Sequence, residues 1–358
     1  MLWPSNNISS LLNIQHPIIQ APMAGSTNPA LVAAVSNAGG LGGHGAAPQS
    51  VDALRKTIKE IKALTNKPFN INLFDHSTER FDKNLQIGDL HRQQLNQYHR
   101  EQGLGEIPSP RCLFGPAQDQ LAVLLDEKVP VISFHFGVDA DTIAYAKSGG
   151  AIVLCTATTA SEAIILEQAG IDAIIAQGSE AGGHQGNFSN AKSALIGCMA
   201  LIPRIVDAVS VPVIAAGGIM DARGIVASFA LGASGVQMGT AFLGCRETQL
   251  SATWLNELEH AEGEDTVITE AFSGKPARGL KNRYITEIDA IDDPLLPYSA
   301  QYSLSSDLRK QAIHQGNKDF MVMWSGQGVG LFKQQTTAIL MQSLVSDSQK
   351  LLLKMATS

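Results

Sequence analysis

The chain has 358 residues, of which 44% are hydrophobic and 16% are charged, and its formal net charge is −7. This length is too great for one small domain and suits a barrel of roughly 250 residues with an added lid. The apolar content excludes extensive disorder, and because no stretch concentrates Lys and Arg, we expect no nucleic-acid partner.

The first 75 residues predict alternating strands and helices. Residues 18–23 and 41–45 are short apolar runs rich in Pro and Gly, and residues 28–37 between them predict a helix. Ser50 is a typical N-cap for the next helix, and residues 69–74 return to a strand. Apolar residues at spacings of three and four give that helix one apolar face: Val51, Leu54, Ile58, Ile61 and Leu64.

The same alternation resumes after residue 115. Five further apolar runs predict strands at residues 129–136, 151–156, 173–177, 212–216 and 235–238. Helical stretches lie between them, for example at residues 161–168 and 221–231. Eight continuous apolar strands, each followed by a helical stretch, predict a parallel sheet covered by helices. This number of units favours a closed (β/α)8 TIM barrel of the α/β class over an open doubly wound sheet.

Two regions lie outside this repeat. Residues 75–115 are polar and predict a long excursion at the catalytic end of a barrel that spans residues 1–245. Residues 246–320 contain short helical pieces and a proline-rich turn, which predict a smaller, mainly helical lid or second domain. The C-terminal segment 321–358 is helical and amphipathic over residues 334–354, so we expect it to pack back on the barrel.

The cysteines and the N-terminus bear on the cellular compartment. The four cysteines are far apart and form no CxxC pair: Cys112, Cys155, Cys198 and Cys245. We therefore expect neither a disulfide framework nor a metal site. Residues 1–15 lack the basic start and apolar run of a signal peptide, and no apolar run is long enough to cross a membrane. The sequence thus predicts a cytoplasmic protein without a membrane partner.

Glycine turns follow the last two predicted strands. Gly217 and Gly218 come after the seventh strand, and Asp221 then begins a helix whose free N–H groups favour an anion. Gly239 and Thr240 come after the eighth strand. Because barrels of this type hold phosphate groups in these two loops, the turns predict a phosphate site. The alternative is that the glycines only form tight turns.

His184 lies in the glycine-rich segment 178–186, directly after the sixth strand. Histidine titrates near neutrality, so this side chain is a candidate to take a proton from an acidic C–H group. A surface histidine beside flexible glycines is the alternative. His44, also at a strand end, is the main rival, and His135 at the end of the fourth strand either lines the pocket or has a buried structural role.

Several segments in a fixed order resemble one known family. They are residues 17–23, 36–42, 70–73, 133–137, 177–186, 215–221 and 231–242. Together they resemble nitronate monooxygenase, the family formerly called 2-nitropropane dioxygenase. Residues 272–283 and 324–327 are similar to the class I branch, which needs no nicotinamide. The sequence Gly43-His44-Gly45 departs from the family pattern on the substrate side of the pocket.

The resemblance implies an FMN cofactor and no metal. Pro22 and Met23 would then lie by the isoalloxazine ring, with Asn72 and Gln177 at its polar edge. Gly182 would lie against the cofactor. The resemblance and the glycine turns together assign the ribityl phosphate to six residues: Gly217, Gly218, Gln237, Met238, Gly239 and Thr240. His184 falls where the family has its catalytic base.

The implied reaction oxidises an alkyl nitronate or propionate 3-nitronate with O2 to a carbonyl compound and nitrite. A neutral nitroalkane would first lose its α-proton to His184. Four basic residues either attract such an anionic substrate or form a solvated helix face: Lys275, Arg278, Lys281 and Arg283.

Other functions fit the same barrel. An FMN-dependent enoyl-acyl-carrier-protein reductase and an NADH:quinone reductase would both consume NADH. A phosphosugar isomerase or synthase would bind no flavin, and a non-catalytic flavin-binding protein would be inert. The expected oligomeric state is a monomer or a homodimer.

Overall fold

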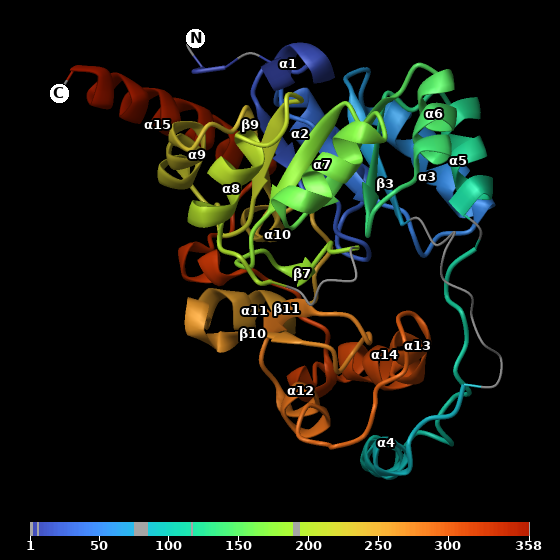
Figure 1. The fold of residues 1–358 in the computed structure, drawn as a ribbon. Helices are drawn as coiled ribbons and strands as arrows, with labels where there is room; N and C mark the ends of the chain where they lie inside the picture. The colour runs from blue at the N-terminus through green and yellow to red at the C-terminus, as the bar shows by residue number, and fades with distance from the viewer. Residues whose placement is uncertain (1–2, 6, 75–84, 116, 189–193, 358) are drawn as a thin grey trace.

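The computed structural model describes residues 3–5, 7–74, 85–115, 117–188 and 194–357. Eight short strands form its central sheet, at the positions that the sequence predicts (Figure 1). In chain order they are β1 (Ile18–Gln20), β2 (Gly42–Gly45), β3 (Phe69–Phe74), β4 (Val131–His135), β5 (Ile152–Ala157), β6 (Ala173–Gln177), β8 (Val213–Ala216) and β9 (Gly235–Met238).

The central sheet closes on itself. Its strand order is β1-β9-β8-β6-β5-β4-β3-β2, and every neighbouring pair is parallel. A parallel bridge between Ile19 and Leu41 joins β1 to the start of the β2 segment. The predicted (β/α)8 barrel is therefore confirmed.

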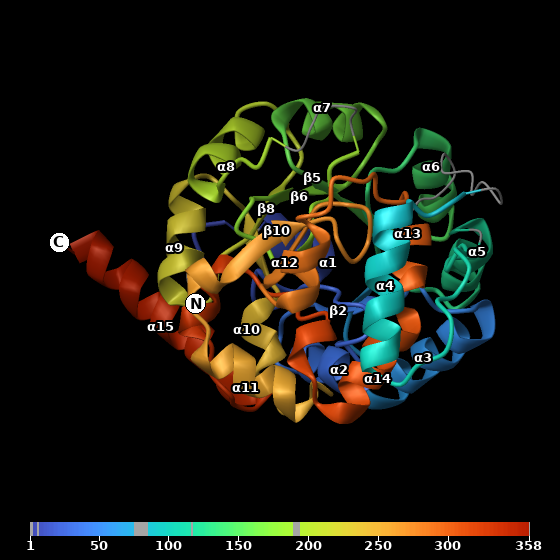
Figure 2. The same cartoon turned by 90° about the horizontal axis from the view of Figure 1, so that it is seen from below.

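Helices cover the outside of the barrel, one after each of its strands (Figure 2). They are α2 (Pro29–Asn37), α3 (Val51–Leu64), α5 (Ala117–Asp126), α6 (Ala140–Ser148), α7 (Ala160–Gln168), α8 (Cys198–Val206), α9 (Ala222–Ala230) and α15 (Thr337–Thr357). A further helix, α1 (Asn7–Leu12), places Ile8 and Leu12 in the apolar cluster that fills the barrel interior. No helix in the described part of the chain is long and apolar enough to span a membrane.

Local sequence signals begin these helices as expected. The Ser50 side chain accepts a hydrogen bond from the Ala53 N–H at 3.3 Å and caps α3, which confirms the predicted N-cap. Leu54, Ile58 and Ile61 of α3 are buried. Val51 and Leu64 are 37% and 53% exposed, because only the central turns of α3 meet the core. The apolar face predicted for this helix was therefore too long.

A lid covers the carboxyl ends of the barrel strands, in the lower half of Figure 1. Its elements are α4 (Asp89–Glu101), α10 (Thr240–Leu243), α11 (Ala252–His260), β10 (Thr266–Thr269), β11 (Ala277–Leu280), α12 (Arg283–Ile288), α13 (Ala300–Leu304), α14 (Ser306–Gln315) and the 3-10 turns η1 (Gly263–Asp265), η2 (Lys318–Phe320) and η3 (Gln327–Leu331). The lid has an apolar core of its own, to which Leu95 and Tyr98 of α4 contribute. The excursion expected at residues 75–115 is described from residue 85 onward, and its helix thus joins the lid.

Among the described residues, β-type backbone pairing connects the lid to the barrel at two places. A two-residue strand after β6, β7 (Gly183–His184), pairs antiparallel with β11, so a barrel loop and the lid share the small sheet β10-β11-β7. At the base of the lid, Cys245 and Gln335 form a parallel bridge. Apart from α4, which comes from the segment between β3 and α5, the lid is therefore inserted between β9 and α15, in the last unit of the barrel. Helix α15 packs back on α9 and α2.

Candidate active site at the barrel mouth

A layer of polar side chains lies above the apolar interior of the barrel. The Ser133 Oγ atom accepts hydrogen bonds from the Nδ2 atoms of Asn70 and Asn72, at 2.8 and 3.0 Å. The Oδ1 atom of Asn70 and the Oε1 atom of Gln237 are buried and have no hydrogen-bond partner among the described residues. Since buried polar atoms normally have partners, these two acceptors suit a ligand with N–H or O–H donors.

The turns after β8 and β9 supply donors. Gly217 and Gly218 have positive φ angles of +124° and +66°, which glycine adopts readily. The backbone N–H groups of Gly218, Gly239 and Thr240 donate to no protein acceptor within the described ranges. A Cβ atom added to Gly239 would lie 3.6 Å from Ala21, so protein packing does not require glycine there. These open N–H groups suit an anionic group that approaches the backbone closely.

The helix after Gly218 differs from the expectation. The Asp221 carboxylate accepts a hydrogen bond from the Arg223 N–H at 2.9 Å and pairs with the Arg223 guanidinium at 2.6 Å. The Asp221 carboxylate thus already provides a negative charge at the N-terminus of α9. The open N–H groups described above therefore belong to the two glycine turns and not to the capped turn of this helix.

Residues 324–328 of the lid reach over both turns. The Gly326 N–H donates to Thr240 Oγ1 at 2.9 Å, and the Gln327 N–H donates to the Glu180 carbonyl at 2.9 Å. A Cβ atom on Gly182 would lie 2.6 Å from the Ser325 carbonyl carbon. The approach of this lid segment therefore explains the glycine at position 182, and sequence reasoning had used the segment only as a mark of the family.

The remaining predicted cofactor residues lie around the mouth. Pro22 and Met23 follow β1 and are half-buried, and Met23 packs against both the barrel core and the lid core. The Met238 side chain is buried in the outer core, the apolar cluster between the barrel strands and the surrounding helices. This residue therefore presents only its backbone to the mouth.

His184 lies on β7, where the barrel loop meets the lid. Its Nε2 atom is 2.9 Å from Ser273 Oγ. The ring packs edge-to-face against Tyr298, Trp324 and Phe136, with centroid distances of 5.1, 5.7 and 5.8 Å. Burial lowers the pKa of His184 to about 3, and the charges of His135 and Lys275 act in the same direction. The imidazole is therefore neutral near pH 7.

The backbone of His184 is fixed from the barrel side. Its carbonyl accepts hydrogen bonds from Gln177 Nε2 at 3.0 Å and from His135 Nε2 at 3.1 Å. The Gln177 Oε1 atom accepts from the Gly186 N–H at 2.7 Å. Both polar ends of Gln177 thus hold the loop, which leaves one N–H and one lone pair for a ligand.

The structure separates the rival histidines. His44 pairs in register with Ile71, whose side chain belongs to the outer core, and its ring nitrogens lie 3.5 Å from Thr27 Oγ1 and 3.3 Å from Gln49 Oε1. His44 therefore faces the helices and not the mouth. His135 lies at the mouth, 3.1 Å from Thr156 Oγ1, and burial lowers its pKa to about 4.

Aromatic side chains form a wall beside His184. Phe136 directly follows β4 and has a φ angle of +70°, a strain of about 1–3 kcal/mol that is typical of functional sites. Its ring contacts Phe74 and Tyr298, with centroids 5.0 and 5.4 Å apart. Sequence reasoning missed this wall, since Tyr298 comes from the lid and nothing in its local sequence marks it.

The four basic residues of the segment 275–283 have different surroundings. Lys275 Nζ lies 4.2 Å from the centroid of the Phe136 ring, at the mouth. Arg278 is buried and donates to the Ser179 carbonyl and to Thr266 Oγ1, while Arg283 pairs with Glu101 and Glu287. Lys281 is exposed. Lys275 is thus the residue of this set that lies beside the site.

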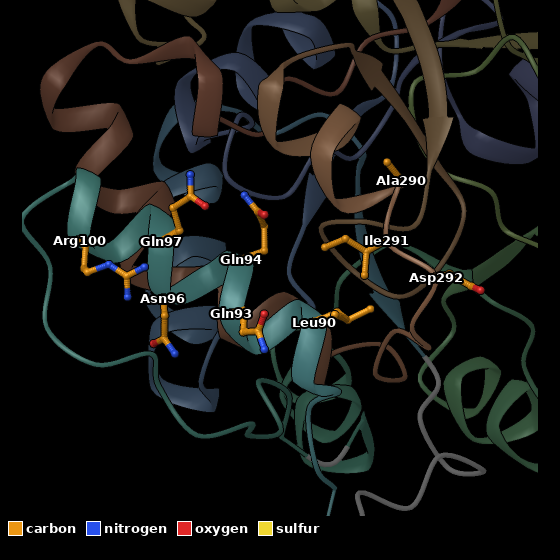
Figure 3. Close-up of a pocket in the computed structure, with 9 residues that line it drawn as sticks. All are labelled: Leu90, Gln93, Gln94, Asn96, Gln97, Arg100, Ala290, Ile291 and Asp292. Carbon is orange, nitrogen blue, oxygen red and sulfur yellow. The ribbon is translucent and has the colours of Figure 1, made fainter.

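A surface hollow of about 620 Å³ lies elsewhere, between α4 and residues 290–292 (Figure 3). Its walls are Leu90, Gln93, Gln94, Asn96, Gln97, Arg100, Ala290, Ile291 and Asp292. None of the predicted site residues lines it, so it is separate from the barrel mouth.

Comparisons with known proteins agree with this arrangement. The family model described as nitronate monooxygenase matches residues 5–347. A probable nitronate monooxygenase of Staphylococcus haemolyticus is 42% identical over 355 residues, which cover 98% of this chain and 99% of the relative. The solved structure of nitroalkane oxidase from Streptomyces ansochromogenes superposes with a TM-score of 0.88 at 36% identity, over 98% of this chain and 100% of the other. FabK from Thermotoga maritima superposes with a TM-score of 0.77 at 30% identity, over 98% of each chain. The chain belongs to the nitronate monooxygenase family and is thus an oxidoreductase.

Proposed function

We propose that this protein is an FMN-dependent nitronate monooxygenase. Its substrates would be alkyl nitronates or propionate 3-nitronate, and also neutral nitroalkanes, which it oxidises with O2 to carbonyl compounds and nitrite. The observation that supports this proposal is a neutral, half-buried histidine beside a polar barrel mouth, in a chain 42% identical to a probable nitronate monooxygenase.

The residues at the mouth fit a flavin mononucleotide. The open N–H groups of Gly218, Gly239 and Thr240 suit its phosphate. The resemblance assigns Gln237 to the phosphate as well, but its unpaired Oε1 atom is an acceptor and suits an N–H group at the edge of the ring instead. When bound, FMN supplies the electron chemistry. The protein's own task is to orient the substrate, exclude water and handle one proton.

His184 has the properties that this task requires. A neutral imidazole accepts the α-proton of a neutral nitroalkane, whereas a nitronate is already ionised and needs no base. Proton transfer creates an imidazolium next to a nitronate, and this opposite charge offsets the burial that lowers the pKa of the free side chain. The aromatic wall strengthens that attraction because it keeps water away.

An anaerobic mixing experiment tests the function. Purified protein should be yellow and contain FMN, and ethyl nitronate added without oxygen should bleach the flavin absorbance. Admission of air should then yield nitrite, and NADH should bleach nothing. Colourless protein that takes up no FMN would contradict the cofactor. Bleaching by NADH without nitrite formation would favour the reductase rivals, and yellow protein inert to both donors would indicate a binding protein.

A further inference from the structure

The side chain of Ser273 faces His184 from the lid, in the turn between β10 and β11. Ser273 is fully buried, with 0% of its surface exposed. Its Oγ atom lies 2.9 Å from His184 Nε2 and 3.0 Å from the Lys275 carbonyl, and the Lys275 N–H donates to it at 3.4 Å. A hydroxyl has one proton to donate and two lone pairs that accept, so these three partners satisfy its full hydrogen-bonding capacity.

These contacts determine where the protons lie. A carbonyl oxygen only accepts hydrogen bonds, so the contact with Lys275 requires the Ser273 proton. His184 Nε2 must then be the donor in its own contact with Ser273. In a neutral imidazole the other nitrogen has the lone pair, and His184 Nδ1 has no protein partner among the described residues.

We propose that Ser273 is a positioning residue that holds His184 as the Nε2–H tautomer, so that Nδ1 is the atom that accepts the substrate proton. This inference rests on the proposed function. The α-C–H bond of the nitroalkane breaks, its electron pair moves into the nitro group to form the nitronate, and the proton binds Nδ1. The resulting imidazolium still donates from Nε2 to Ser273.

The surroundings of His184 limit other arrangements. Its carbonyl accepts from Gln177 and His135, and β7 pairs with β11 through Ala277. The backbone is therefore held from two sides, and the ring packs against three aromatic neighbours. Among the described residues, Ser273 is the hydrogen-bond partner of the His184 ring, at Nε2, so it decides which ring nitrogen is basic.

Nitrogen NMR of FMN-loaded enzyme labelled with 15N-histidine tests the tautomer directly. The signals of His184, assigned by their loss in His184→Asn, should show a protonated Nε2 and an unprotonated Nδ1 in the parent enzyme. Ser273→Ala should populate the Nδ1–H tautomer, and Ser273→Thr, which keeps the hydroxyl, should not. A parent enzyme with a protonated Nδ1, or an unchanged spectrum in Ser273→Ala, would overturn the proposal.

Activity with two substrates separates positioning from folding. We expect Ser273→Ala to lower kcat/KM for neutral nitroethane roughly tenfold or more, and to change kcat/KM for ethyl nitronate by less than about twofold. Ser303→Ala removes an equally buried serine hydroxyl from α13, and it should leave both values unchanged. Equal losses with both substrates in Ser273→Ala would contradict positioning. A parent enzyme that forms no nitrite from either substrate would contradict the proposed function, while the NMR spectrum would still decide the role of Ser273.

Discussion

The barrel and the lid contribute different chemistry to the same mouth. The barrel supplies backbone N–H groups from two glycine turns and a layer of amide side chains on β3, β6 and β9. The lid supplies side chains: the Ser273 hydroxyl, the Lys275 ammonium and the rings of Tyr298 and Trp324. Under the proposed function, the barrel would bind the part of a cofactor that many enzymes share, and the lid would shape the proton transfer.

The boundary between the two regions passes through His184. Its chain belongs to a barrel loop, yet its strand pairs with β11 and its ring packs against lid residues. Variants on the barrel side should therefore change cofactor affinity, and variants around the His184 ring should change proton transfer. Two experiments test this division, and a third tests whether the fold keeps the histidines at the boundary neutral.

The largest expected effect is that of His184→Asn. With neutral nitroethane, kcat/KM should fall by roughly 100-fold or more, because the base that takes the α-proton is lost. With ethyl nitronate the loss should be small, since this substrate is already ionised. Nitrite formation with each substrate at the same pH measures both values. The exposed His314→Asn on α14 is the matched control, and full activity of His184→Asn on nitroethane would refute the assigned role.

A smaller effect is expected from Gly239→Ala on the barrel side. The added Cβ has room within the protein, 3.6 Å from its nearest neighbour, so the melting temperature should not change. It would nevertheless hold the phosphate away from the backbone N–H groups, and a lost hydrogen bond to a charged group weakens binding about tenfold or more. FMN titration followed by flavin fluorescence measures this. Gly105→Ala, with open space around it, is the control, and unchanged affinity in Gly239→Ala would place the phosphate elsewhere.

The smallest effect concerns stability in acid. Burial lowers the pKa of His135 to about 4 and that of His184 to about 3, from the ordinary value of 6.5. Below pH 6.5 the unfolded chain therefore binds protons that the folded protein excludes. The free energy of unfolding should decline as the pH falls from 6.5 toward 3, and these two groups should have no influence above pH 6.5.

Urea unfolding at pH 7 and pH 5 measures this decline. His135→Gln, which keeps an N–H donor toward the His184 carbonyl, should lose less stability between the two pH values than the parent protein does. Equal losses in the two proteins would show that His135 is not kept neutral by the fold.

Local signals in the sequence predicted the barrel well. Ser50 caps α3 as expected, and the apolar strands lie where their composition indicates. The orientation of His44 was not predictable in this way, because the glycines around it give no apolar alternation to show which face is inward. Its register with Ile71 and its ring contacts with Thr27 and Gln49 show that it faces the helices.

The lid side of the site depends on contacts between distant parts of the chain. His184 and Ser273 are 89 positions apart in the sequence, and β7 has only two residues, which is too short for any periodic signal. The capped N-terminus of α9 was missed for a different reason. Asp221 was interpreted as the start of a helix open to an anion, although a carboxylate at an N-cap itself satisfies one of the free N–H groups.

The bridge between Cys245 and Gln335 has a consequence for how this architecture can vary. Arg246 N–H donates to the Gln335 carbonyl at 2.9 Å, and Gln335 N–H donates to the Gly244 carbonyl at 3.0 Å, so the chain leaves the barrel and returns to it at one point. The segment between Cys245 and Gln335 therefore occupies the place where a tight turn would be enough to continue the barrel. Segments of other lengths and shapes, provided that their ends meet, therefore fit the same scaffold while the glycine turns after β8 and β9 stay in place.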